Sequence, residues 1–256
     1  MMESEIKIGD VNIFISGENN FSERPVIIFL HESLGCTELW RDFPAKLGEK
    51  TKFNILVYDR QGHGRSGPFI SDKRKNDYME DEANTLNELM QECQIKNAIL
   101  YGHSDGGTIA LLAASKYPSK ISGVITEAAH VFVEEVTLEG IRKAVETFHS
   151  TDLKQKLMKY HGDKTESVFY AWADKWLSDE FRNWNIEHML PDIQCPVLAI
   201  QGEHDEYGSI KQIDAIANHV PGPAYKLIIP DTGHTPHKED SEETLKRSAE
   251  FINNLK

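Results

Sequence analysis

Alternating and continuous runs of hydrophobic residues predict a sheet that begins with an antiparallel hairpin. Isoleucine and valine alternate with polar residues over residues 6–8 and 11–15, and Gly9 and Asp10 supply the turn between them. Near-continuous apolar runs follow at residues 26–30, 55–58, 98–101, 121–125, 197–200 and 225–229. Such runs indicate strands buried on both faces, and helical spacing separates the first four, as over residues 83–93. The pattern predicts an α/β protein with a mostly parallel sheet.

The long interval between the fourth and fifth of these runs predicts an insertion. It has helical spacing and contains no strand-like run. We therefore expect a helical cap at residues 131–190, inserted into a core formed by residues 1–130 and 191–256. A chain of 256 residues is long enough to bury one large core of this kind.

The acidic composition argues against nucleic acids and anionic membranes as partners. Asp and Glu number 41 against 28 Lys and Arg, and the formal net charge of -13 repels phosphate groups. Cys36, Cys93 and Cys195 are widely spaced and fit neither a disulfide framework nor a zinc site. The first residues do not resemble a signal peptide, and no apolar run is long enough to cross a bilayer. We expect a cytoplasmic protein.

A serine between two glycines is the first candidate for chemistry. Residues 102–106 form a G-x-S-x-G pattern, which follows a predicted strand and precedes an apolar, alanine-rich helix. In that context the serine occupies a sharp turn, and only glycine fits at the flanking positions. The pattern alone arises often by chance, but its place between a strand and a helix makes Ser104 the predicted nucleophile.

An aspartate and a histidine follow Ser104 at the ends of the last two predicted strands. Asp205 lies just past the fifth apolar run, where ligand-facing groups of open α/β sheets collect, and Glu203 and Glu206 are competitors. His234 lies in a polar loop after the last run. Because a serine hydroxyl needs a base to take its proton, we predict His234 as the general base and Asp205 as the acid that orients it.

Two other patterns are typical of metal or cofactor sites, and we disfavour both. His234, His237 and Glu239 include no H-E-x-x-H helix, and we expect His237 to be a hydrogen-bonded structural residue. Residues 62–67 match G-x-G-x-x-G, but Pro68 continues a loop where a dinucleotide site needs a helix. We predict neither a metal nor a cofactor.

Backbone N–H groups near Ser104 are candidates for binding a negative oxygen in a transition state. Asp105, directly after the serine, should give one donor, and the loop at residues 31–35 the other, with Ser33 preferred and Glu32 next. If the Asp105 carboxylate faces the cleft, it should attract a cationic α-amino group on the substrate. The alternative is that this carboxylate turns away and pairs locally.

Aromatic residues of the predicted cap are candidates for a substrate pocket. Phe169, Trp172 and Trp176 share one helical face, a stripe that more often packs than binds. Because a cap lies over the active site, some of these rings should still line an apolar pocket. The predicted substrate-binding residues are Glu32, His130, Phe132, Trp172, Trp176 and Tyr207.

Taken together, the motifs resemble the α/β-hydrolase superfamily over nearly the whole chain. They are HESLG, DRQGHGRSG, GHSDGG, GEHDEYG and DTGHTPH, and GHSDGG with AASKYPSKI and AAHVFVEE is similar to the biphenyl-hydrolase-like, or valacyclovir hydrolase, esterases. The resemblance implies an α/β-hydrolase fold: an eight-stranded, mostly parallel sheet, helices on both faces and a cap after the sixth strand. It also implies a Ser–Asp–His triad that hydrolyses carboxylic esters. His31-Glu32 departs from the usual His-Gly of the oxyanion loop.

The leading functional hypothesis is hydrolysis of small-molecule carboxylic esters through an acyl-enzyme on Ser104, by a monomer or homodimer. Lactonases, C–C bond hydrolases and hydroxynitrile lyases use the same triad, and a ligand-sensing protein that barely turns over can retain it. Dehalogenases and epoxide hydrolases are disfavoured because their nucleophile is an aspartate.

Overall fold

A mixed, mostly parallel sheet forms the centre of the molecule. The computed structural model describes residues 2–18, 21, 24–71 and 73–255, so residues 1, 19–20, 22–23, 72 and 256 of the predicted core lie outside it. Within these residues eight strands are ordered β1-β2-β4-β3-β5-β6-β7-β8. The first two strands and the β2–β4 pair are antiparallel, and the other neighbours are parallel. The strands are β1 Met2–Ile8, β2 Val11–Gly17, β3 Val26–Leu30, β4 Asn54–Tyr58, β5 Ala98–His103, β6 Ile121–Glu127, β7 Val197–Gly202 and β8 Ala224–Ile229.

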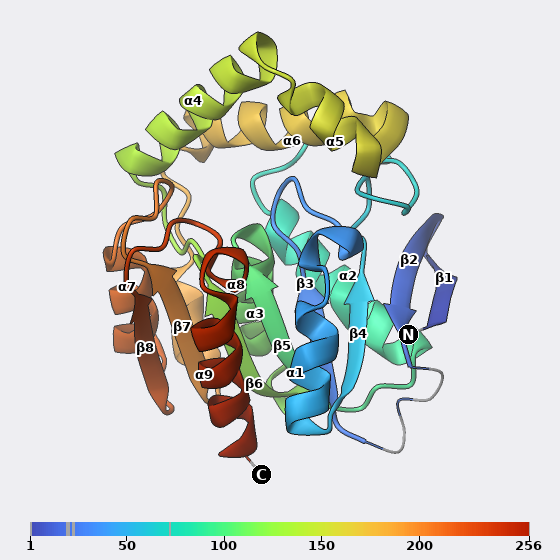
Figure 1. Ribbon diagram of the computed structural model, residues 1–256, viewed down its shortest axis with the longest axis vertical. Helices are drawn as coiled ribbons and strands as arrows, with labels where there is room; N and C mark the ends of the chain where they lie inside the picture. The colour runs from blue at the N-terminus through green and yellow to red at the C-terminus, as the bar shows by residue number, and fades with distance from the viewer. Residues whose placement is uncertain (1, 19–20, 22–23, 72, 256) are drawn as a thin grey trace.

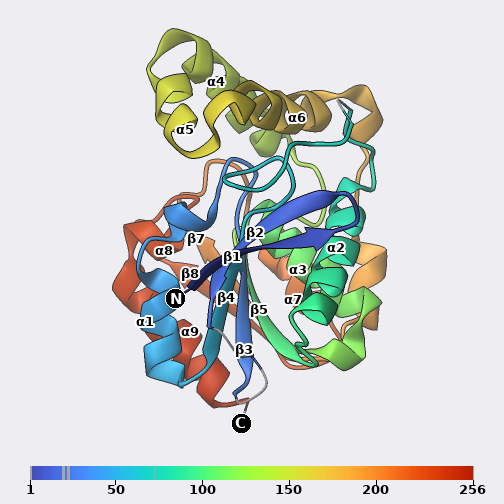
Figure 2. The same cartoon turned by 90° about the vertical axis from the view of Figure 1, so that its right-hand side faces the viewer.

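Helices cover both faces of this sheet, as predicted (Figures 1 and 2). In Figure 1, α1 and α9 lie in front of the strands, whereas α2, α3 and α7 lie behind them. Each face therefore contributes apolar side chains to a buried core. The core helices are α1 Phe43–Thr51, α2 Tyr78–Glu92, α3 Asp105–Lys116, α7 Lys211–His219, α8 Pro236–Glu239 and α9 Ser241–Asn253.

The continuous apolar runs mark the central strands, and the edge strand differs from them. Every residue of β3, β4 and β5 is buried, as expected for strands with helices on both sides. Strand β8 was predicted from a similar run, but Tyr225 and Ile228 are 54% and 45% exposed. Because β8 is the last strand in the sheet order, it is less covered than its neighbours.

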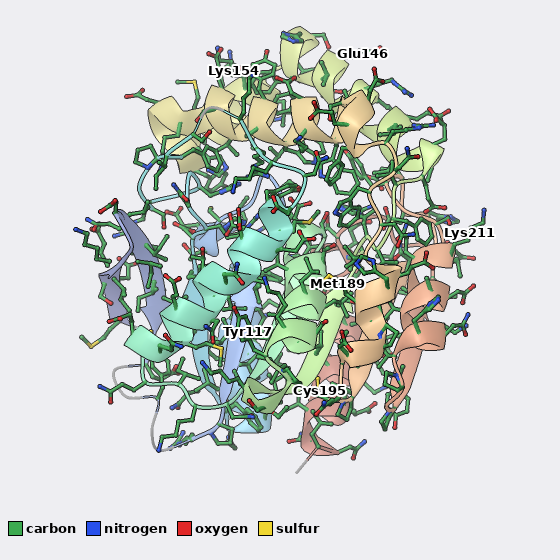
Figure 3. The ribbon with its side chains drawn as sticks, turned by 180° about the vertical axis from the view of Figure 1, so that it is seen from behind. Tyr117, Glu146, Lys154, Met189, Cys195 and Lys211 are labelled. Carbon is green, nitrogen blue, oxygen red and sulfur yellow. The ribbon has the colours of Figure 1, made fainter. Side chains whose placement is uncertain are left out.

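A helical insertion follows β6 and lies over the end of the sheet at which β5 leads into α3 (Figure 1). Figure 3 shows Glu146 and Lys154 on this cap, far from Cys195 at the opposite end of the molecule. The insertion confirms the predicted cap, although its limits at residues 131 and 190 stay a prediction. No helix in the described part of the chain is both long and apolar enough to cross a bilayer. The cap elements are α4 Glu135–Ser150, α5 Leu153–His161, η3 Gly162–Lys164, α6 Thr165–Leu177 and η4 Asp179–Phe181, whereas η5 Glu187–Asp192 packs against α3 and α7 of the core (Figure 3).

Candidate active site

Ser104 occupies the sharp turn between β5 and α3. Its backbone has φ 52° and ψ -120°, a conformation that non-glycine residues rarely adopt. A Cβ atom on Gly102 would overlap the Gly106 carbonyl, and one on Gly106 would overlap the Leu30 carbonyl. The strand, turn and helix predicted from the G-x-S-x-G pattern are therefore present, and packing requires both glycines.

Asp205 and His234 meet through a hydrogen bond of 2.8 Å between Oδ1 and Nδ1. Asp205 Oδ1 also accepts from the backbone N–H groups of Tyr207 and Gly208, and Gln201 donates to its other oxygen. Burial alone would raise the pKa of Asp205, but the His234 ring, with smaller contributions from the Tyr207 N–H and His130, outweighs it and lowers that pKa. Burial conversely opposes a charge on His234, yet the Asp205 carboxylate raises the pKa of the ring.

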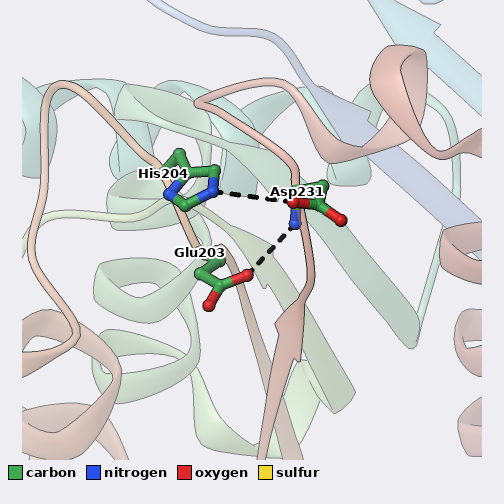
Figure 4. A group of neighbouring side chains, drawn as sticks. All are labelled: Glu203, His204 and Asp231. Atoms are coloured by element: carbon green, nitrogen blue, oxygen red, sulfur yellow. Dashed lines mark hydrogen bonds and ion pairs between the residues drawn. The ribbon is translucent and has the colours of Figure 1, made fainter.

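The two glutamates that compete with Asp205 on sequence grounds do not bond to His234. Figure 4 shows Glu203 beside His204 and Asp231, and all three side chains are exposed. Glu203 accepts from the Asp231 N–H at 3.2 Å, while His204 Nε2 is 3.8 Å from Asp231 Oδ1. Glu206 is also exposed and acts on His234 only through its charge.

His237 belongs to a separate, fully buried pair. Its Nδ1 lies 2.6 Å from Glu127 Oε2, and the Tyr101 hydroxyl donates to the other oxygen of Glu127. Glu239 instead accepts from the backbone N–H groups of Gly233 and Thr235. The three side chains that the sequence offered as possible metal ligands, at positions 234, 237 and 239, thus bond to three different groups.

A cavity of about 180 Å³ opens beside the serine turn and brings most of the predicted site residues together. Ser104 and His234 both line it, and no hydrogen bond joins them among the described contacts; this bond often tightens only in the substrate complex. Phe132, predicted to bind substrate, is not among the lining residues; its backbone forms an isolated antiparallel bridge with Asn185. The lining residues are Glu32, Ser33, Leu34, His103, Ser104, Asp105, His130, Thr137, Ile141, Trp172, Trp176, Tyr207, His234 and Thr235.

Several lining residues were missed from the sequence. Thr137 and Ile141 are four positions apart on α4, so helical spacing in the cap was a signal that could have found them. His103 had no such signal. Its Nε2 lies 2.8 Å from the His234 carbonyl oxygen, which links the serine turn to the histidine loop, and burial lowers its pKa.

The loop after β3 lines the same cavity as the serine turn. Ser33 and Asp105, the two predicted oxyanion donors, both line the cavity beside Ser104. Within the described residues, neither backbone N–H donates to another protein group. The loop closes through a hydrogen bond of 3.0 Å from the Gly35 N–H to the Glu32 carbonyl.

The Asp105 carboxylate is 1% exposed and pairs locally. It accepts from the Tyr78 hydroxyl at 2.8 Å, and guanidinium nitrogens of Arg74 and Arg60 lie 3.8 and 4.0 Å away. This geometry is the alternative in which the carboxylate turns away from the cleft and pairs locally. Its charge is already balanced by protein groups, which weakens the expectation of amine recognition at Asp105.

The glycine-rich segment at residues 62–67 is a loop. Gly62 and Gly64 have positive φ angles of 83° and 45°, and the Asp59 carboxylate accepts from the Arg65 N–H inside the loop. After β4, the next helix in the described residues begins only at Tyr78. The helix N-terminus that a dinucleotide fingerprint requires is therefore not part of this segment.

The sequence matches the family model described as alpha/beta hydrolase fold over residues 25–161, more than half of the chain. The protein belongs to this family. It is similar to the serine hydrolase BPHL of Homo sapiens, with 31% identity over 237 residues, which cover 88% of this chain and 78% of that protein. The Mus musculus BPHL is also 31% identical, over 79% of this chain and 70% of that protein. These matches place the chain among serine hydrolases.

Solved structures agree on the fold. A carboxylesterase from Nitrososphaera gargenis superimposes with a TM-score of 0.80 and 18% identity, over 98% of each chain. The proline iminopeptidase of Mycobacterium smegmatis gives a TM-score of 0.76 and 19% identity, over 99% of this chain and 98% of that one. At such low identity the likeness concerns the fold alone.

Proposed function

We propose that this protein is a carboxylic ester hydrolase that works through an acyl-enzyme on Ser104, with His234 as general base and Asp205 as the orienting acid. The observation that carries the proposal is the hydrogen bond between His234 Nδ1 and Asp205 Oδ1 at the wall of the cavity that Ser104 also lines. A carboxylate only accepts hydrogen bonds, so Nδ1 carries the hydrogen and Nε2 is left to accept a proton.

The reaction proceeds in two acyl-transfer steps. Ser104 Oγ attacks the ester carbonyl carbon while its proton passes to His234 Nε2, and collapse of the tetrahedral intermediate breaks the C–O bond to the alcohol. The histidine gives its proton to that leaving oxygen. Water, deprotonated by the same nitrogen, then attacks the acyl carbon, and the histidine returns that proton to Ser104 Oγ as the C–Oγ bond breaks and the acid is released.

The Ser33 and Asp105 backbone N–H groups serve as the oxyanion donors in this proposal. Both are unpaired in the described residues and belong to elements on either side of Ser104. Ile141, Trp172 and Trp176 give the cavity an apolar wall under the cap. A cavity of about 180 Å³ suits a small acyl or alcohol group.

The test is covalent labelling combined with a substrate screen. A fluorophosphonate probe should label Ser104, and Ser104→Ala should lose both the label and about 10⁴-fold or more of the ester turnover while retaining its fold. Labelling at another residue, or an active alanine variant, overturns the nucleophile. The screen covers p-nitrophenyl esters, amino-acid esters, lactones and dienone acids. Turnover confined to lactones or dienone acids replaces the ester assignment, and labelling without turnover on any of them indicates a ligand-sensing protein.

A further inference from the structure

Three histidines hold the oxyanion loop, residues 32–35, through its backbone carbonyls. One comes from the end of β3, one from the glycine-rich loop at residues 62–67, and one from the cap. The contacts are His31 Nδ1 to the Glu32 carbonyl at 2.7 Å, His63 Nε2 to the Ser33 carbonyl at 2.9 Å and His161 Nε2 to the Leu34 carbonyl at 2.9 Å.

His161 is the member of this set that belongs to the cap. It is the last residue of α5 and is 2% exposed. Its Nδ1 accepts from the Gly64 N–H at 3.0 Å, so in the neutral ring Nε2 carries the hydrogen and donates it to the Leu34 carbonyl. Burial lowers the pKa of His161, which favours this neutral form.

The Leu34 carbonyl is connected to Ser33 through two rigid peptide planes. It shares a plane with the Gly35 N–H, which points the opposite way and donates to the Glu32 carbonyl. That carbonyl in turn shares a plane with the Ser33 N–H. The Glu32 carbonyl faces Arg60 and His31, neither of which lines the cavity, so the Ser33 N–H is directed away from them.

From this geometry we propose that His161 is a positioning residue for the oxyanion hole, through which the cap sets the direction of the Ser33 N–H. The inference rests on the proposed ester hydrolase function. In this arrangement, the cap contributes to turnover itself as well as to the walls of the pocket. A donor that is misdirected loses its interaction with the charge that develops in the transition state but changes substrate binding little.

Lys164 supplies a matched control, because it joins the cap to the core at the same corner without touching the oxyanion loop. Its ammonium group donates to the carbonyl oxygens of His63, Gly64 and Ser66. Lys164→Met therefore weakens the attachment of the cap but leaves the bond between His161 and the Leu34 carbonyl in place.

The experiment compares His161→Leu, His161→Gln and Lys164→Met with the wild type. Glutamine can accept with its oxygen and donate with its nitrogen, so it can replace both bonds of the ring, whereas leucine can replace neither. For each variant, kcat and KM are measured on the best p-nitrophenyl ester, together with the inhibition constant of an aryl trifluoromethyl ketone, which forms an oxyanion on Ser104. Thermal unfolding reports the stability of each.

His161→Leu should lower kcat about 10- to 100-fold with little change in KM, and should raise the inhibition constant of the ketone by a similar factor. His161→Gln should recover most of both losses, and Lys164→Met should lower the unfolding temperature while kcat and the inhibition constant stay within about threefold of wild type. Equal kinetic losses in His161→Leu and Lys164→Met, or a loss confined to KM, overturn the inference. If His161→Leu does not fold, His161→Asn takes its place with the same expectations, because its shorter amide can accept from the Gly64 N–H in place of Nδ1 but does not reach the Leu34 carbonyl. An active wild type with unaffected His161 variants refutes the positioning role alone, whereas a wild type that neither turns over esters nor binds the ketone refutes the proposed function too.

Discussion

Two histidines three residues apart each pair with a carboxylate, but one pair lies at the cavity wall and the other in the buried core. His234 pairs with Asp205 at 2.8 Å, and its side chain is 13% exposed at the cavity wall. His237, three residues later, pairs with Glu127 at 2.6 Å and is 2% exposed, with its ring 4.5 Å from that of Trp40.

The difference shows that a histidine–carboxylate pair is not in itself a sign of catalysis. Both carboxylates are held ionised in the same way: burial alone would raise their pKa, and the facing ring together with other neighbouring groups lowers it more. What separates the pairs is whether the free ring nitrogen reaches a space that a substrate can enter. We therefore expect His234 variants to change turnover and His237 variants to change stability.

The largest effect on turnover is expected at His234, and the same substitution at His237 is the comparison. His234→Gln removes the proposed base and should lower kcat/KM by about 10⁴-fold or more, with the fold intact. His237→Gln should leave kcat/KM within about tenfold. Ester turnover and thermal unfolding of the two purified variants provide the measurement, and similar turnover losses in both would contradict the distinction between the pairs.

The next largest effect on turnover is expected at Asp205, the carboxylate that pairs with His234. Asp205→Asn should lower kcat by about 10³- to 10⁴-fold with KM little changed, because the amide favours the wrong histidine tautomer. Glu203→Gln is the control, as Glu203 is exposed and bonds to Asp231 instead of His234. Steady-state kinetics distinguish the two variants. If Asp205→Asn kept wild-type activity and Glu203→Gln lost it, Glu203 would be the orienting acid.

A smaller effect on turnover but a large one on stability is expected at Glu127. Glu127→Ala leaves His237 and Tyr101 without their shared partner in the core, and breaking a buried pair of this kind costs about 3–5 kcal/mol. Because the pKa of Glu127 is depressed below 4.5, the wild-type pair stabilises the fold above that pH and loses its contribution as the pH falls through the lowered value. Urea unfolding at pH 7 and near pH 4 should thus show a smaller difference between variant and wild type at the lower pH. An equal difference at both would count against an ionised Glu127.

The smallest effect is a shift in the pH profile. As the proposed base, His234 must be neutral to accept the serine proton. Because its pKa is raised above 6.5, kcat/KM should rise with pH to a plateau, with its midpoint above that value. Glu206 helps to raise this pKa from an exposed position. Glu206→Gln should therefore move the midpoint to lower pH, less so at high salt, which screens exposed charges. A midpoint that does not move in low salt would argue against this charge effect.

Much of the fold could be predicted because local patterns encode local structure. The alternation over residues 6–8 and 11–15 became β1 and β2, and the continuous runs became the parallel strands. The stripe of Phe169, Trp172 and Trp176 is a buried face of α6. Strand β8 was found from its run, but its partial exposure follows from its place at the sheet edge, which no local pattern records.

For the site, the sequence by itself determined the chemistry that was available: a serine between two indispensable glycines, and an aspartate and a histidine after later strands. Only the tertiary structure decided how those groups are used. It separated His234 from His237, turned the Asp105 carboxylate toward Tyr78, 27 residues away, and brought His161 to Leu34 across 127 residues. The physical reason is that such contacts depend on how distant elements pack, whereas the period of a sequence pattern reports only the next turn of a helix or the next residue of a strand.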